Sequence, residues 1–256
     1  MRVRNFLKYL LVFSQMHKVV AFSKKTRTFV VPNVPKKEIV FSTKQAIYYN
    51  YLRSPDLDMV ISVGPAGTGK TLIACKAALE SLHANEISKI ILTRPTVTVD
   101  GEEIGFLPGG IQDKFQPFSQ PLFDCFQKES CKYDVESLIK KGKIEVCPLG
   151  FLRGRTFDNA FIIADEMQNS VTSQTKMLLT RVGKNSKLVV TGDNTQCDLD
   201  GGMETNGLHH LLERLATMYP TMPDMVEDNM AIVRFTEDDC KRSKFVLKIL
   251  KIYNSF

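Results

Sequence analysis

The segment from Gly64 to Thr71 has the residue types and spacing that a phosphate-binding loop, or P-loop, requires. It reads GPAGTGKT, which satisfies the pattern G-x-x-x-x-G-K-[ST]. Glycines allow a tight turn whose backbone N–H groups point at phosphate oxygens, and the start of the next helix adds its positive end. The alternative is a glycine-rich turn between a strand and a helix that binds nothing. The predicted binding residues are Gly64, Pro65, Ala66, Gly67, Thr68, Gly69, Lys70 and Thr71.

Within this loop, two side chains are expected to act directly on a bound triphosphate. Lys70 would reach the β- and γ-phosphates, and the Thr71 hydroxyl would hold Mg²⁺. The loop follows an apolar run at 59–63 and precedes a helical pattern. That context is the one a P-loop needs, so the sequence favours a phosphate site over a plain turn.

Two acidic residues, Asp165 and Glu166, follow the apolar run at 160–164. A P-loop needs a carboxylate at the end of a neighbouring strand for the water shell of Mg²⁺, and Asp165 would supply it. Glu166 is placed to activate the attacking water as a general base. Acids at this position can also be no more than a solvated strand end, but the P-loop upstream favours the catalytic interpretation.

Another polar group, Thr191 to Gln196, also ends an apolar run. A carboxamide at the carboxyl end of a strand beside the P-loop can sense the γ-phosphate or orient the water. The same residue types are ordinary turn formers. Gln45 lies 19 residues before Gly64 and could contact an adenine edge, although a lone Gln in a helix is usually a surface residue.

Short apolar strands alternate with helical patterns from residue 44 onward. The predicted strands are 59–63, 89–93, 144–146, 160–164, 188–191 and 231–235. The predicted helices are 45–52, 70–83, 121–126, 135–141, 173–181, 208–218 and 243–252, with a loop at 220–228. Strands interleaved with helices indicate βαβ units. The sequence therefore predicts an α/β fold with a mostly parallel β-sheet flanked by helices.

With these motifs in place, the chain resembles the PhoH family of P-loop ATPases, which is related to the core of superfamily 1 helicases. The resemblance covers about residues 40 to 254 and includes several separate blocks in the family's order and spacing. These blocks are the P-loop, 92–95 (LTRP), 105–109 (GFLPG), 153–156 (RGRT), 161–169 (FIIADEMQN), 179–183 (LTRVG) and 191–196 (TGDNTQ). The resemblance implies a P-loop NTPase fold.

The resemblance also implies an enzyme that binds ATP with Mg²⁺ and hydrolyses it. The implied residues are Lys70, Glu166 and Gln196 for catalysis, Thr71 and Asp165 for Mg²⁺, and Gln45 for adenine. Arg242, in a segment similar to the family's Asp-x-x-Arg block, is a candidate arginine finger, in cis or from a neighbouring subunit of a homo-oligomeric ring. Ser243-Lys244 replaces a His-Pro-like pair, and a surface arginine that opens a helix is the alternative.

Members of the family are linked to RNA metabolism, so the resemblance implies single-stranded RNA or an RNA-processing partner. We expect four arginines near phosphate of either ATP or RNA: Arg94, Arg153, Arg155 and Arg181. Phe106 and Phe115 in the loop 96–116 could stack on bases or could anchor the loop to the core. We expect no second motor lobe in this chain, so any strand movement would need an oligomer.

The positive charge is concentrated near the N-terminus. The chain has 34 Lys and Arg against 28 Asp and Glu, a net charge of +6, and residues 1–37 hold nine of the bases and no acid. The remainder has 34 − 9 = 25 bases against 28 acids, a net charge of −3, so its composition does not indicate nucleic-acid binding. We divide the chain into a basic N-terminal arm or transit segment (1–37) and a PhoH-like ATPase domain (38–256).

Composition permits a packed core and argues against a membrane span. Hydrophobic residues make up 43% and charged residues 24% of the chain. No apolar stretch approaches the roughly 20 residues of a transmembrane helix, so we expect no membrane association. The scattered cysteines suit a reducing compartment. We expect a cytoplasmic protein, or one of an organelle matrix or stroma if residues 1–37 are a transit segment.

Two other classes of function are alternatives. A nucleotide-gated switch would bind ATP and a protein partner with little turnover, but Glu166 argues against it because a switch needs no general base. A small-molecule kinase would use Arg153 and Arg155 in a lid, but these residues precede a predicted strand. Measured ATP turnover separates the switch from the ATPase.

Overall fold

The computed structural model describes residues 40–96, 135–193, 196, 197, 199, 202, 205–241 and 248. These residues include the P-loop and all the strands predicted from the sequence. The N-terminal arm (1–37), the helices predicted at 121–126 and 243–252, both Phe residues of the loop 96–116, and Arg242 lie outside them. What was predicted of those segments therefore stays a prediction.

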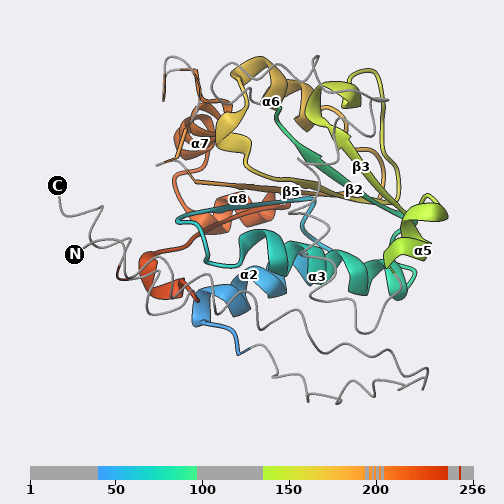
Figure 1. Ribbon diagram of the computed structural model, residues 1–256. Helices are drawn as coiled ribbons and strands as arrows, with labels where there is room; N and C mark the ends of the chain where they lie inside the picture. The colour runs from blue at the N-terminus through green and yellow to red at the C-terminus, as the bar shows by residue number, and fades with distance from the viewer. Residues whose placement is uncertain are drawn as a thin grey trace, which may run out of the picture. The chain divides into compact units, whose positions relative to one another are not determined.

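Six parallel strands form one sheet in the order β3-β2-β4-β5-β1-β6 (Figure 1). Every pairing in this sheet is parallel, which confirms the α/β class and extends the expected parallel pattern to all the described strands. The strands are β1 (Met59–Val63), β2 (Lys89–Arg94), β3 (Ile144–Pro148), β4 (Ala160–Ala164), β5 (Lys187–Gly192) and β6 (Met230–Arg234). The P-loop strand β1 therefore lies between β5 and the terminal strand β6.

Helices cover both faces of this sheet, which is why its central strands are continuous apolar runs. All five residues of β4 are buried. One core cluster includes Tyr48, Leu79 and Phe161, and the cluster on the other face includes Ile162 and Leu208. The helices on the first face are α2 (Thr43–Arg53) and α3 (Lys70–His83), and those on the second are α6 (Thr172–Leu179) and α7 (Gly207–Met218) (Figure 1).

The carboxyl ends of the strands carry the residues that were expected to act on a nucleotide. The P-loop follows β1, Arg94 ends β2, Asp165 follows β4 and Asp193 follows β5. In a parallel sheet these ends meet along one edge, where α/β proteins bind their ligands. The fold thus brings residues that are far apart in the sequence to one side of the sheet.

Most predicted elements are confirmed, with bounds within two residues of those expected. The shorter helical elements are α5 (Val135–Lys140), η3 (Leu149–Leu152), η4 (Met167–Asn169), α8 (Met222–Glu227) and η6 (Glu237–Asp239). Among the helices that the structure describes, none combines the length and apolar character needed to cross a bilayer.

The prediction of a loop at 220–228 is wrong, because α8 lies within it. Proline in the first turn does not break a helix, since the N–H group that it lacks would have no intrahelical partner there. Thr221 caps this helix by accepting from the Asp224 N–H at 3.4 Å, and the Asp224 side chain accepts from the Thr221 N–H at 3.2 Å. This reciprocal capping box outweighs the turn-forming composition.

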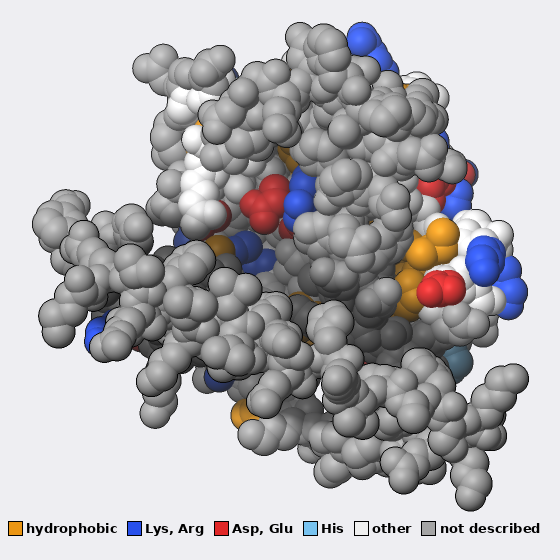
Figure 2. All heavy atoms as spheres, in the orientation of Figure 1, with side chains coloured by type: hydrophobic (Ala, Val, Ile, Leu, Met, Phe, Trp, Pro, Cys, Tyr) orange, Lys and Arg blue, Asp and Glu red, His pale blue; other side chains and the backbone are white. Residues whose placement is uncertain are grey.

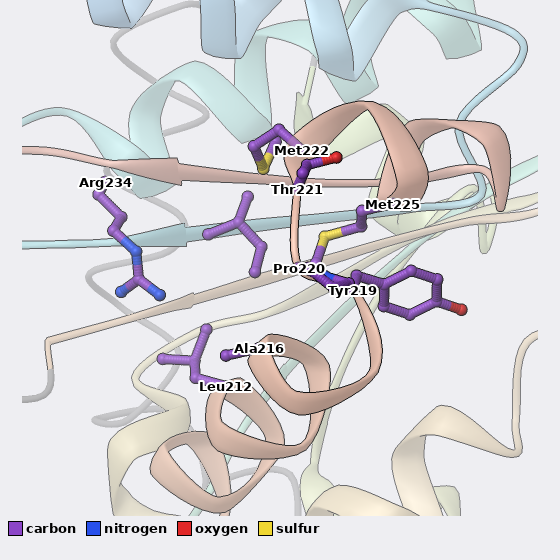
Figure 3. Close-up of a pocket in the computed structure, with 9 residues that line it drawn as sticks. Leu212, Ala216, Tyr219, Pro220, Thr221, Met222, Met225 and Arg234 are labelled. Atoms are coloured by element: carbon purple, nitrogen blue, oxygen red, sulfur yellow. The ribbon is translucent and has the colours of Figure 1, made fainter.

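A largely apolar pocket of about 300 Å³ lies between α7, α8 and β6. Figure 3 shows Arg234 at one side of this pocket and Tyr219 at the other, with Leu212 and Met222 on opposite walls. The helix that the sequence did not predict therefore forms one wall of a pocket beside the terminal strand of the sheet.

Lys187, at the start of β5, gives the fold a pH-dependent stability. Its Nζ donates to Ser54 O at 2.8 Å and to Leu57 O, and burial lowers its pKa from 10.5 to about 8. Between these two pH values the unfolded chain holds a proton that the folded protein has released. The contribution of Lys187 to the free energy of unfolding should therefore rise with pH in this window, by at most about 1.4 kcal/mol per pH unit.

Urea unfolding at about pH 7.5 and about pH 9.5 tests this prediction. Lys187→Met keeps the aliphatic stem and should lose this contribution, so that from the lower to the higher pH its free energy of unfolding changes less favourably than that of the wild type. Lys141→Met removes an exposed lysine and should keep the contribution. Equal pH dependence in the wild type and Lys187→Met would contradict the prediction.

Candidate active site

The P-loop makes a turn that only glycine fits at its first position. Gly64, Gly67 and Gly69 have φ angles of 143°, 86° and 85°, which residues with side chains rarely adopt. A Cβ on Gly64 would lie 2.6 Å from the Phe235 carbonyl oxygen. Helix α3 then begins without a side-chain cap on its first N–H groups. These groups and the helix dipole suit an anion.

Side chains of the loop itself hold its first carbonyl groups. Lys70 Nζ donates to Gly64 O at 2.5 Å and to Pro65 O at 2.9 Å. Thr68 Oγ1 also donates to Pro65 O, at 2.9 Å. The lysine that was expected to bind phosphate is therefore kept at the loop by the loop's own backbone.

Donors from distant parts of the chain hold the next three carbonyl groups. They are Cys240 Sγ to Ala66 O at 3.7 Å, Lys241 N to Gly67 O at 3.2 Å, and Gln45 Nε2 to Thr68 O at 2.9 Å. Every carbonyl from residue 64 to residue 68 thus has a donor. Because these acceptors are satisfied by protein groups, the loop conformation is fixed before any ligand binds.

Asp165 is the polar centre of the site and is 1% exposed. Its Oδ1 accepts from Thr71 Oγ1 at 2.7 Å and from Thr191 Oγ1 at 2.5 Å. Its Oδ2 accepts from Arg94 Nη2 at 2.5 Å, which makes an ion pair. A buried carboxylate needs such partners, because an uncompensated charge is costly away from water. Thr71 and Asp165, both predicted to serve Mg²⁺, are therefore in direct contact.

The oxygen atoms of Thr71 and Asp165 fit a magnesium ion, which prefers hard oxygen ligands. The Thr71 hydroxyl gives its hydrogen to Asp165, so its lone pairs remain available to a cation. The Arg94 guanidinium supplies positive charge at the other carboxylate oxygen. Figure 2 shows acidic and basic side chains side by side near the middle of the face in view.

Glu166 follows Asp165 in a left-handed conformation, with φ 54° and ψ 40°. For a residue other than glycine this costs of order 1 kcal/mol, and such strain is concentrated at functional sites. The Gln168 carboxamide donates to Glu166 Oε2 at 2.6 Å and accepts from the Asp193 N–H at 3.0 Å. Gln168 therefore bridges the ends of β4 and β5 and orients the Glu166 carboxylate.

Gln196 lies beyond this bridge. The residue is exposed, and its backbone N–H donates to Asp193 O at 3.1 Å. Asn194 and Thr195 are outside the described residues. The role expected for Gln196 at the γ-phosphate stays a prediction.

Gln45 is 3% exposed and lies under the P-loop on α2. Its Oε1 accepts from the Ser42 N–H at 2.9 Å, within the capping box that starts the helix. Its Nε2 donates to Thr68 O and, at 3.2 Å, to Asp239 O. The structure thus gives the carboxamide that was expected to contact adenine a set of protein partners.

Of the four arginines expected near phosphate, all of them among the described residues, Arg94 is the one that contacts Asp165. Arg155 forms an ion pair with Glu145 at 2.6 Å, and its hydrogen bonds lower the pKa of Glu145 to about 2. Arg181 donates to Met177 O at 3.2 Å, and Arg153 is exposed. Arg155 and Arg181 are held by other groups of the chain, and their expected place near phosphate of ATP or RNA stays a prediction.

Sequence reasoning did not assign roles to Thr191, Gln168 or Asp239. The contact of Thr191 with Asp165 could have been predicted, because Thr191 lies near the end of β5 and the parallel register with β4 brings it level with Asp165. For Asp239 the signal was Thr236 three residues earlier, the spacing of a capping box. The bridge made by Gln168 depends on tertiary contacts, and no local pattern indicates it.

Comparisons with known proteins agree on one family. The family model PhoH, described as PhoH-like protein, matches residues 39–254. A PhoH-like protein of Bacillus subtilis (strain 168) is 40% identical over 197 residues, which cover 77% of this chain and 58% of that protein. One of Synechocystis sp. is 50% identical over 142 residues, covering 56% of this chain and 43% of the relative. The chain spans about half the length of the curated relatives it matches.

Among solved structures, the large terminase from a thermophilic bacteriophage aligns with a TM-score of 0.49 at 16% identity. The alignment covers 83% of this chain and 49% of the terminase chain.

Gly64→Ala tests the close approach between the P-loop and Phe235. The new Cβ would collide with the Phe235 carbonyl, so the loop or the end of β6 must shift. We expect the free energy of unfolding to fall by about 2 kcal/mol or more, as for other strained or overpacked sites. Urea unfolding measures the change.

Gly142→Ala is the matched control. Gly142 also has a positive φ, 65°, but nothing lies within 4 Å of the position that a Cβ would take. It should cost only the backbone strain, about 1 kcal/mol. Equal losses in the two variants would contradict the collision.

Proposed function

We propose that this chain, which belongs to the PhoH-like protein family, binds ATP with Mg²⁺ and hydrolyses it. The observation that carries the proposal is the contact of Thr71 with Asp165 at 2.7 Å, at the start of the helix that the P-loop opens. It joins the two predicted metal ligands, which are 94 residues apart in the sequence. Glu166 is the next residue, so a base stands beside the metal site.

In the proposed reaction, the P-loop and Lys70 bind the β- and γ-phosphates. Thr71 and Asp165 hold Mg²⁺, which when bound neutralises charge on the phosphate oxygens. Glu166 accepts a proton from the water that attacks the γ-phosphorus. The bond from that phosphorus to the bridging oxygen breaks, and ADP leaves.

Gln168 supports the proposed base. Its contact with Glu166 Oε2 fixes one carboxylate oxygen and leaves the other to accept a proton. Its other end is tied to the Asp193 backbone, so the orientation depends on the end of β5. A nucleotide-gated switch needs no general base, so it would not need a side chain that orients Glu166.

The second part of the proposal names the effector of this ATPase. The effector is single-stranded RNA or an RNA-processing protein. Support comes from the resemblance of the motif blocks to a family linked to RNA metabolism. Exposed Arg153 in the block 153–156 is available to a phosphate backbone. The arginine finger Arg242 and the homo-oligomeric ring belong to the same proposal.

Glu166→Gln tests the hydrolysis step. Loss of the base should lower kcat for ATP by about 10²- to 10⁴-fold, while the Kd for Mg-ATP changes little. Phosphate release and calorimetry measure the two quantities. Glu136→Gln, an exposed acid of α5, is the matched control and should turn over normally. Tight ATP binding with negligible turnover in the wild type would favour the nucleotide-gated switch, and unchanged kcat in Glu166→Gln would contradict the base.

Added single-stranded RNA should raise the ATPase rate at roughly 0.1 M salt, and fluorescence anisotropy should detect its binding. Heparin at equal charge tests whether negative charge alone is enough. If RNA neither stimulates hydrolysis nor binds, the proposed effector is contradicted and the ATPase proposal still stands.

A further inference from the structure

Phe151 is an exposed aromatic residue at the carboxyl end of β3. It belongs to η3, which follows that strand directly, and it is 55% exposed. Among the Phe and Tyr residues that the structure describes, it is the one that is neither buried nor half-buried. A flat ring in this position is available to stack on another planar group.

The residues on either side hold Phe151 at the surface. Leu149 and Leu152 are buried in the core cluster on the face that α6 and α7 cover, and η3 also contacts α6. Because both ends of this short helix are anchored, Phe151 stays at the surface when no ligand is bound. A ring that is already in place costs less to order on binding than one that must first be fixed.

The ring is flanked by an arginine and by open main chain. Arg153 is exposed, and a Cβ added at Gly150 or Gly154 would meet nothing within 4 Å. Glycine at such positions lets a ligand approach the backbone closely. We call these four exposed residues, Gly150, Phe151, Arg153 and Gly154, the η3 surface. It combines a planar apolar group with a guanidinium, and it contains no acid.

The ion pairs beside the η3 surface add positive charge. Arg155 lies over the Phe157 ring, 4.6 Å from its centroid, and pairs with Glu145 at 2.6 Å. Lys89 pairs with the same carboxylate at 2.8 Å. Two bases against one acid leave this cluster with a net charge of +1, next to Arg153 in the sequence. The local charge therefore favours an anion, although residues 38–256 as a whole have a net charge of −3.

The η3 surface lies on the same edge of the sheet as the proposed nucleotide site. Pro148, the last residue of β3, is the register partner of Arg94 at the end of β2. Arg94 in turn contacts Asp165. A ligand on the η3 surface would therefore lie beside the strand whose last residue contacts the proposed metal site.

We infer that the η3 surface binds single-stranded nucleic acid, with the Phe151 ring stacked on a base and the Arg153 guanidinium paired with a phosphate. Aromatic rings that stack on bases and basic groups that follow the backbone are the means by which proteins hold single strands. A duplex does not fit, because its bases are already stacked on one another. The inference rests on the proposed function, since it names the place where the RNA effector binds.

Tryptophan fluorescence tests the stacking directly. The chain contains no tryptophan, so Phe151→Trp introduces a single reporter and keeps an aromatic ring. Binding of a uridine oligomer of about 12 nucleotides should quench its emission, because a stacked base quenches indole fluorescence. Ile47→Trp is the matched control. Ile47 is 41% exposed on α2, which covers the other face of the sheet, and its emission should not change.

Two further variants separate the ring from the charge. Phe151→Leu keeps an apolar side chain without a ring, so the Kd of the oligomer should rise roughly tenfold in fluorescence anisotropy at about 0.1 M salt. Its salt dependence should stay as in the wild type. Arg153→Gln should instead lower the slope of log K against log salt by about 0.7, the value for one phosphate contact. Arg214→Gln, at an exposed arginine of α7, should change neither quantity.

A deoxyuridine oligomer of equal length distinguishes RNA from DNA as the ligand. The tighter binder of the two identifies the source, and Phe151→Leu should weaken both by the same factor. Thermal unfolding checks that each variant is folded, which we expect because the substituted side chains are exposed.

Unquenched emission of Phe151→Trp with the oligomer bound would overturn the inference. An unchanged Kd in Phe151→Leu would overturn it too, and would leave the η3 surface to a protein partner. Wild-type protein that does not bind the oligomer would contradict the proposed effector, and the inference with it. That outcome is seen before any variant is compared, and ATP hydrolysis without RNA is measured independently, so the failures are distinguishable.

Discussion

The buried carboxylate of Asp165 is the constraint on which the arrangement of the site depends. An isolated charge at this depth would be strongly unfavourable, so the surrounding elements must bring it donors. Thr71 from α3, Thr191 from β5 and Arg94 from β2 each provide one. Three strands and the helix of the P-loop are therefore held in one register at their carboxyl ends. The same contacts place Glu166, the next residue, beside the proposed metal site.

A second constraint acts on the backbone of the P-loop. A phosphate loop is useful only if its N–H groups face the ligand, and this requires its carbonyl groups to be satisfied elsewhere. Here the donors include Lys70 within the loop, Gln45 on α2 and Lys241 beyond β6. The shape of the loop thus depends on segments at both ends of the described chain. Sequence motifs alone do not determine it.

The strands and the P-loop were predictable because they depend on local patterns, namely apolar runs and glycine spacing. Asp165 and Glu166 were predictable for the same reason, since they follow a buried strand directly. The helix α8 was missed because two prolines were given more weight than its capping box. The partners of Gln45 and Arg155 depend on tertiary packing, and one sequence contains no local signal for them. The resemblance to a family therefore did not indicate which parts of the fold these two side chains contact.

The position of β6 at the margin of the sheet has a consequence for biosynthesis. This strand and residues 235–241 are among the last described parts of the chain to leave the ribosome, yet Phe235 lies against Gly64 and Cys240 supports the loop at Ala66. A nascent polypeptide that had emerged only as far as β5 would contain the whole glycine-rich motif without Phe235, Cys240 and Lys241, which shape part of it. Competence to bind a nucleotide would therefore be acquired only after residues up to 241 have emerged and β6 has docked.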